Sequence, residues 1–276
     1  MKTITLSSGS QVPVLGFGTW QLTPEECLNS VSMALDIGYR HIDTAQAYGN
    51  EAEVGTALRQ SGVARENVFV TTKISRANLA EGNVINSAEQ SLRSLQMDYV
   101  DLLLVHWPLQ EMPFEQTLED FATLQQQGKA RNIGISNFTV AQMRRVVEEL
   151  GINVATNQVE YHPFLGQSAV LEYCLSHNMF LTAYCPLARG EALASAELQA
   201  IGQAHGKTAT QVALRWLIQQ QGVVAIPRSR SQDHIQSNFD IFDFELSQAE
   251  MERINLLPKD HRLVNPPFAP QWDNAA

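Results

Sequence analysis

Eight short apolar segments alternate with helical patterns along most of the chain, and this repeat restricts the possible folds most strongly. The segments are rich in Val, Ile and Leu and have the length of buried strands. Strands that each lead into a helix pair in parallel. We predict strands over residues 14–19, 41–43, 68–73, 100–106, 132–136, 155–160, 180–184 and 223–227.

Start signals support the predicted helices as well as their apolar spacing. Thr23, Pro24 and Glu26 form a capping box with proline at the first helical position. A threonine and a glutamine with the same spacing open the segments after residues 139 and 208. Asn50 and Glu53 predict another such cap. The predicted helices cover residues 24–37, 51–60, 80–95, 114–127, 168–177, 194–205, 209–220, 233–241 and 249–255, with one more beginning after residue 139.

Eight strand–helix units in a chain of this length fit a closed (β/α)8 TIM barrel, an α/β fold. Residues 2–13 alternate around a Ser-Ser-Gly-Ser turn, which predicts a β-hairpin covering one end, and residues 257–276 predict an irregular C-terminal loop. A doubly wound open sheet is the alternative, but its usual glycine-rich turn after the first strand is missing. The sequence shows no linker, so we expect one domain over residues 1–276.

Composition limits the partners and the compartment. The net charge of −10 argues against nucleic acid or an anionic membrane surface. No apolar run approaches the roughly 20 residues needed to cross a bilayer, and the first residues show no apolar signal-peptide region. Three scattered cysteines indicate neither a disulfide framework nor a zinc site. We therefore expect a cytoplasmic protein that does not bind membranes, nucleic acid or a metal.

Polar side chains collect where the predicted strands end. The active site of such barrels lies at the carboxyl ends of the strands. Each of these residues alone has a structural explanation, but their convergence on one rim favours a functional site. The residues at these ends are Trp20, Asp43, Lys73, His106, Ser136, Asn137, Gln158 and Tyr184.

Four residues suggest general-acid chemistry. Tyr48 lies in the loop after the second strand, and a phenol with a pKa of about 10 is a poor acid at neutral pH. Lys73, on the neighbouring strand, is expected to lower the pKa of Tyr48, and Asp43 is expected to hold Lys73 as an ion pair. His106 would orient a substrate oxygen.

The sequence lacks a recognisable nucleophile for this site. It contains no Gly-x-Ser-x-Gly turn, reactive-cysteine context or metal cluster. Hydride from a bound nicotinamide would supply the missing reactant. An aldolase in which Lys73 forms a Schiff base is an alternative interpretation.

Three separated motifs resemble those of the aldo-keto reductases. They are residues 38–45 (GYRHIDTA) with Tyr48, residues 133–138 (IGISNF) and residues 226–229 (IPRS). The similarity extends from about residue 4 to the C-terminus. Within the family, the chain is most similar to the bacterial 2,5-diketo-D-gluconate reductases.

The resemblance implies an NAD(P)H-dependent oxidoreductase that reduces small aldehydes, α-dicarbonyls or keto-sugars. It implies that Tyr48 is the general acid, assisted by Asp43, Lys73 and His106. It also implies that Trp20 and Trp107 line the substrate pocket, with the C-terminal tail as a variable wall. The residues expected to bind the cofactor are Gly18, Thr19, Ser136, Asn137, Gln158, Tyr184, Leu187, Arg228, Ser229, His234 and Asn238.

The loop after the last strand departs from the family pattern. Arg228 and His234 stand where lysine and arginine are usual for the adenosine 2′-phosphate, and Ser237 replaces a usual glutamate. Arg228 keeps the cation and binds phosphate well, and Arg230 could compensate for His234. We expect NADPH to be preferred over NADH, but less strongly than in typical members.

The expected partner is a small carbonyl substrate, and the expected state is a monomer. A different class of function also fits the sequence: a redox-sensing regulatory barrel that binds the nucleotide with little turnover. The set of four residues formed by Tyr48, Asp43, Lys73 and His106 favours the enzyme.

Overall fold

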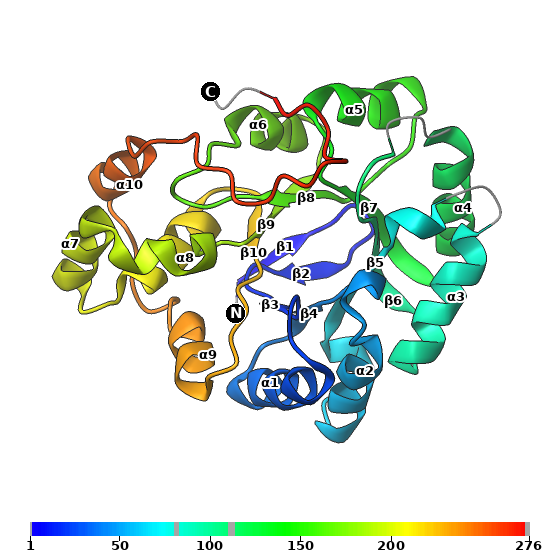
Figure 1. Ribbon diagram of the computed structural model, residues 1–276, viewed down its shortest axis with the longest axis horizontal. Coiled ribbons are helices and arrows are strands. Elements are labelled where there is room, and N and C mark those ends of the chain that lie inside the picture. The colour runs from blue at the N-terminus through cyan, green and yellow to red at the C-terminus, as the bar shows by residue number, and fades with distance from the viewer. Residues whose placement is uncertain (1, 80–82, 110–113, 274–276) are drawn as a thin grey trace.

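The structure is a parallel eight-stranded barrel surrounded by helices (Figure 1). The computed structural model describes residues 2–79, 83–109 and 114–273. All neighbouring strands in the barrel run parallel, in an order that follows the sequence, as the repeat predicts. The strands are β3 (Phe17–Gly18), β4 (His41–Asp43), β5 (Phe69–Ile74), β6 (Val100–Val105), β7 (Ala130–Ser136), β8 (Thr156–Glu160), β9 (Phe180–Tyr184) and β10 (Val223–Ala225).

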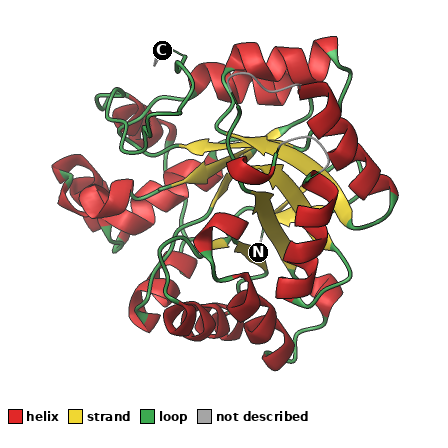
Figure 2. Cartoon of the chain, turned by 45° about the vertical axis from the view of Figure 1, so that its right-hand side comes forward, coloured by secondary structure: helices red, strands yellow, loops and turns green. Residues whose placement is uncertain are grey.

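The helices cover the outer face of the strands (Figure 2). Between strands and helices lies an apolar core whose residues range from Val14 to Ile254. None of the helices described by the structure has the length and apolar character of a membrane span. The helices are α1 (Pro24–Ile37), α2 (Glu51–Gln60), α3 (Val84–Leu95), α4 (Phe114–Gln126), α5 (Val140–Arg144), α6 (Ser168–Ser176), α7 (Ala196–His205), α8 (Ala209–Gln219), α9 (Gln232–Phe239) and α10 (Gln248–Asn255).

The barrel closes between its first and last strands. Leu15 pairs in parallel with Ala225, and the amide of Gly16 donates to the carbonyl of Ala225 at 2.9 Å. The predicted hairpin is present as β1 (Thr3–Thr5) and β2 (Gln11–Pro13), paired antiparallel. Ser8 in its turn donates to Asn132 of β7 at 2.6 Å. The hairpin therefore lies at the amino ends of the strands, opposite the expected active site.

Three predicted capping boxes are confirmed, and one is wrong. The caps at Thr23, Thr139 and Thr208 each have both reciprocal hydrogen bonds. Asn50 is the N-cap of α2, but its side chain does not bond the helix backbone. Its amide instead donates to the carbonyls of Thr19 and Leu22 at 2.9 and 3.1 Å. The Asn50 side chain therefore binds carbonyls of the loop after β3 and does not cap the helix in the way that the spacing alone predicted.

The remaining differences lie at element ends. The helix predicted over residues 80–95 is present from Val84, and residues 80–82 lie outside the described part. The first and last strands are shorter than predicted, since regular pairing is confined to Phe17–Gly18 and Val223–Ala225.

The backbone of α3 approaches α2 so closely at Gly55 that a β-carbon there would overlap the carbonyl oxygen of Leu95. Helix propensity alone favours Gly55→Ala by about 1 kcal/mol. Overpacking against a backbone atom typically costs roughly 1–3 kcal/mol. We predict a net loss of stability for Gly55→Ala, measured as the free energy of unfolding in urea. The exposed Ala52 of the same helix is the control, because Ala52→Gly tests propensity without this contact. A more stable Gly55→Ala variant would contradict the steric interpretation.

Candidate active site

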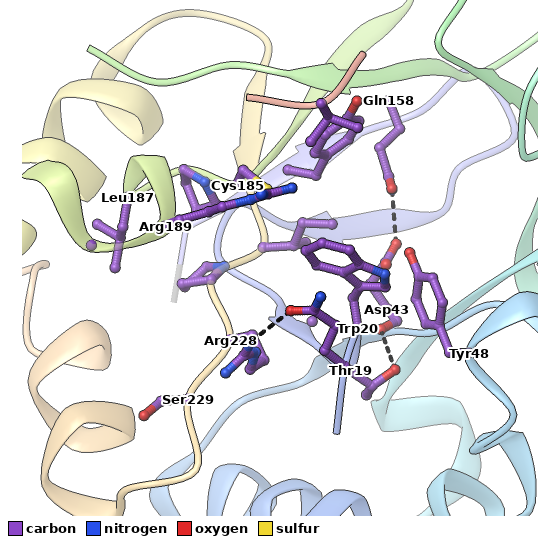
Figure 3. A pocket seen from close by; sticks show the side chains of 18 of the residues that line it. Thr19, Trp20, Asp43, Tyr48, Gln158, Cys185, Leu187, Arg189, Arg228 and Ser229 are labelled. Atoms are coloured by element: carbon purple, nitrogen blue, oxygen red, sulfur yellow. Dashed lines mark hydrogen bonds between the residues drawn. The ribbon is translucent and has the colours of Figure 1, made fainter. Parts of the chain in front are cut away.

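A cavity of about 1040 Å³ opens at the carboxyl ends of the strands. Figure 3 shows its wall, with Trp20, Tyr48, Gln158 and Arg228 contributed by different loops and strands. Of the residues expected to bind substrate, bind cofactor or act in catalysis, the structure places all but Lys73 on the cavity wall. These are Gly18, Thr19, Trp20, Asp43, Tyr48, His106, Trp107, Ser136, Asn137, Gln158, Tyr184, Leu187, Arg228, Ser229, His234 and Asn238.

Lys73 lies beneath this wall in a fully buried ion pair. Its Nζ is 2.6 Å from a carboxylate oxygen of Asp43 and donates to the carbonyl of Thr44 at 2.7 Å. The other carboxylate oxygen of Asp43 accepts a hydrogen bond from the Gln158 amide at 2.8 Å. Burial lowers the pKa of Lys73, while the charge of Asp43 opposes that effect and favours the ammonium form. The ion pair thus connects β4 with β5, and the hydrogen bond from Gln158 connects both to β8.

The environment of Tyr48 differs from the expectation in one respect. The Lys73 ammonium lies 3.5 Å from the Tyr48 hydroxyl, as the sequence predicts. However, burial raises the pKa of Tyr48 well above its ordinary value, and the negative charge of Asp43 adds to this effect. The prediction of a lowered pKa is therefore wrong, because desolvation of the phenolate outweighs the nearby cation. Tyr48 keeps its proton at neutral pH and is available as a donor.

His106 is held neutral beside Tyr48. Burial lowers the pKa of His106 to about 3, and the Lys73 charge adds to this shift. The two rings meet edge to face with centroids 5.6 Å apart. The backbone amide of His106 donates to Ile74, and its carbonyl accepts from Asn137. A neutral imidazole can donate a single hydrogen bond to an oxygen bound next to Tyr48.

Amide and hydroxyl groups line the cavity next to this centre. The Ser136 hydroxyl donates to the carbonyl of Gln158 at 2.8 Å. Asn137 has a positive φ of 65° and accepts from the Tyr184 hydroxyl at 2.8 Å. This contact fixes the Tyr184 ring at the cavity wall. The side-chain NH2 group of Gln158 donates to Asp43. The side-chain oxygen of Gln158 is therefore the atom that can bind a further group.

A cationic region forms another part of the cavity. Arg228 and Arg230 both donate to Gln21, at 3.4 Å to its side chain and 3.1 Å to its carbonyl. Burial and the charge of Arg230 lower the pKa of Arg228. His234 and Ser229 lie on the same loop and helix. Arg230 also pairs with Glu26 at 3.0 Å, so Arg228 is the guanidinium that remains available to an anion such as a phosphate.

The C-terminal tail supplies part of the cavity wall. Phe268 packs edge to face against Trp107, with centroids 5.4 Å apart, and Val264 also lines the cavity. The carboxylate of Glu160, at the end of β8, accepts hydrogen bonds from the amides of Leu263 at 2.7 Å and Val264 at 2.8 Å. Burial opposes ionisation of Glu160, but these bonds and His162 lower its pKa overall. The tail is therefore fastened to the barrel by a buried carboxylate.

Sequence reasoning did not assign several lining residues. Arg76, which follows β5, was not identified, although a cation three residues after Lys73 was visible in the sequence. Arg189 was missed as well, and its guanidinium lies 5.4 Å from the centre of the Trp20 ring. No local sequence pattern predicts the contact between Phe268 and Trp107, because that contact depends on the path of the C-terminal tail.

Comparison with known proteins gives a consistent result. The model of the Aldo/keto reductase family matches residues 14–257. A glyoxal reductase of Bacillus subtilis is 40% identical over 95% of this chain and 94% of its own length. A methylglyoxal reductase of Escherichia coli is 38% identical over 95% of this chain and 99% of its own. A crystal structure provisionally described as a 2,5-diketo-D-gluconic acid reductase B superimposes with a TM-score of 0.95 at 44% identity, covering 99% of this chain and 98% of that one.

The low pKa of His106 has a consequence for stability. In the unfolded chain this histidine takes up a proton near pH 6.5, whereas in the folded chain it does so only near pH 3. The unfolded state binds more protons between these values, so the free energy of unfolding falls as the pH falls below 6.5. One such group contributes a slope of about 1.4 kcal/mol per pH unit. We predict that His106→Gln reduces the slope measured by urea denaturation between pH 6 and 4. An unchanged slope would show that His106 titrates normally in the folded protein.

Proposed function

Because the chain belongs to the aldo-keto reductase family, we propose that it is an NADPH-dependent oxidoreductase that reduces small carbonyl compounds. The proposed substrates are aldehydes, α-dicarbonyls or keto-sugars, and the products are alcohols. The glyoxal and methylglyoxal reductases among its relatives support this choice. The observation that carries the proposal is the arrangement of Tyr48, Lys73, Asp43 and His106 at the base of the cavity.

The residues present fit a nicotinamide nucleotide. The Tyr184 ring, fixed by Asn137, offers an aromatic face for a planar ring, and Gln158 offers an amide oxygen to a carboxamide. The arginines near Gln21 offer cations to phosphate groups. When bound, the reduced nicotinamide supplies hydride to the carbonyl carbon.

The residues of this chain manage the proton. His106 donates a hydrogen bond to the carbonyl oxygen and positions it next to the Tyr48 hydroxyl. As negative charge develops on that oxygen, the hydroxyl of Tyr48 transfers its proton. The Lys73 ammonium, 3.5 Å from the phenol oxygen, stabilises the phenolate that forms. Burial excludes water from this charge, so the single cation has a large effect.

The alternative functions fare differently. A Schiff-base aldolase needs a lysine amine that reaches the substrate, but Lys73 is fully buried and already donates to Asp43, Thr44 and Tyr48. The geometry therefore does not favour the aldolase. A regulatory barrel that binds the nucleotide with little turnover remains a second candidate, and turnover measurements separate it from the reductase.

The proposed setting is the cytoplasm, where the protein acts as a monomer. The support is chemical: Cys27 and Cys174 are buried free thiols whose pKa values burial raises to about 12. Cysteines that stay free, as these do, fit a reducing compartment such as the cytoplasm.

Tyr48→Phe tests the general-acid role. The ring remains but the proton donor is lost, so we predict a fall in kcat of about 100- to 10,000-fold. Binding of NADPH, followed by quenching of tryptophan fluorescence, should not change. Tyr39→Phe is the matched control, because the Tyr39 hydroxyl donates to the carbonyl of Ile235 away from the cavity. Near-normal turnover of Tyr48→Phe would refute the assignment.

The cationic region predicts a preference for NADPH over NADH. We expect a higher kcat/KM with NADPH in the wild type, since only NADPH carries the 2′-phosphate. Arg228→Met should lower kcat/KM with NADPH by about 10- to 100-fold, because a charge-assisted contact is lost. The same variant assayed with NADH is the control and should change little. A wild-type preference for NADH would contradict our interpretation of this loop.

A further inference from the structure

Arg76 lies across the cavity mouth from the arginines that suit a phosphate. It follows β5 directly and lines the cavity, three residues after Lys73. In the closed order of strands, β5 and β10 are three places apart, and Arg228 and Arg230 follow β10. The role proposed for the other arginines therefore does not extend to Arg76.

The guanidinium of Arg76 is held against the aromatic wall of the cavity. Its carbon atom Cζ lies 4.7 Å from the centre of the Phe268 ring. Phe268 in turn packs edge to face on Trp107, the residue after His106. Stacking on an aromatic face fixes the plane of a guanidinium and leaves the N–H groups at its edge available to a planar acceptor. Arg76 is thus oriented before any ligand binds.

Within the part of the chain that the structure describes, Arg76 lacks the partner that a guanidinium normally has. Its Nε is buried and has no hydrogen-bond acceptor in the structure. Within residues 2–79, 83–109 and 114–273, no acidic side chain forms an ion pair with it. A buried N–H group without an acceptor is unfavourable, and so is a partly desolvated charge. A carboxylate bound to the terminal nitrogens of the guanidinium would supply oxygen acceptors and the opposite charge.

We propose that Arg76 binds a carboxylate of the substrate, so that the cavity selects oxo acids over neutral carbonyl compounds of the same size. The inference rests on the proposed reductase function. The carbonyl oxygen of the substrate lies at Tyr48 and His106, its carboxylate lies at Arg76, and the carbon chain between them packs against Trp107 and Phe268. Arg76 is then a residue that determines specificity and takes no part in proton transfer.

The test compares two substrates with the same aldehyde and ring: 4-formylbenzoate, which is charged, and its neutral, slightly larger methyl ester. We expect the wild type to reduce the acid with the higher kcat/KM. Arg76→Met should lower kcat/KM for the acid by about 10- to 100-fold, mainly through KM, and change that for the ester by less than about threefold. Arg76→Lys should recover part of the loss, because it restores the charge without the fork of donors.

Arg59→Met is the matched control. Arg59 is exposed on α2, and its replacement makes the same change in net charge away from the cavity. Arg59→Met should leave kcat/KM unchanged for both the acid and the ester. Equal losses for acid and ester in Arg76→Met would overturn the proposal, since they indicate a change in cavity shape. A wild type that reduces the ester without preferring the acid would also overturn it, while leaving the reductase function intact.

A binding measurement tests the site without turnover. The probes are the alcohols 4-(hydroxymethyl)benzoate and its methyl ester, titrated calorimetrically with NADP⁺ present. Tighter binding of the acid by the wild type that is lost in Arg76→Met supports the carboxylate site, even if reduction of both aldehydes fails and refutes the reductase. Equal binding of acid and ester by the wild type overturns it.

Discussion

The buried ion pair between Asp43 and Lys73 is the contact on which the site depends. Taking two charges out of water is costly, and the cost is offset only when each charge has further hydrogen bonds. Thr44 and Gln158 supply these bonds, so the pair connects three strands of the barrel. Loss of one partner would leave a buried charge unpaired, typically at a cost of roughly 3–5 kcal/mol. The same pair that fixes the cavity floor also places the cation next to Tyr48.

Burial acts in opposite directions on the groups around this pair. It raises the pKa of Tyr48 and lowers the pKa of His106. Both side chains are therefore neutral, and each has one proton to donate to a hydrogen bond. A lowered phenol pKa is not needed for this chemistry. In the proposed mechanism, the phenolate of Tyr48 would form with Lys73 beside it, in a buried region. Desolvation therefore determines the protonation states of Tyr48 and His106 as much as the neighbouring charges do.

The sequence predicted the barrel because the alternation of strands and helices is a local, repeated signal. It also predicted which residues lie on the cavity wall, because parallel strands bring their carboxyl ends together. It failed where a long-range contact decides the outcome. Asn50 bonds the carbonyls of Thr19 and Leu22 instead of its own helix. The pKa of Tyr48 depends on total burial, which no local pattern reveals. The orientation of Arg76 depends on its contact with Phe268, which is almost 200 residues away in the chain.

The attachment of the tail at Glu160 has a consequence for how such an enzyme diversifies. The barrel supplies the proposed proton donor, Tyr48, and the ion pair, while Val264 and Phe268 line the cavity from a segment outside the barrel. The attachment uses backbone amides of Leu263 and Val264, which any residue except proline provides. The side chains at these two positions can therefore be exchanged without removing the hydrogen bonds to Glu160. Substrate range and catalytic machinery are thus open to separate evolutionary change.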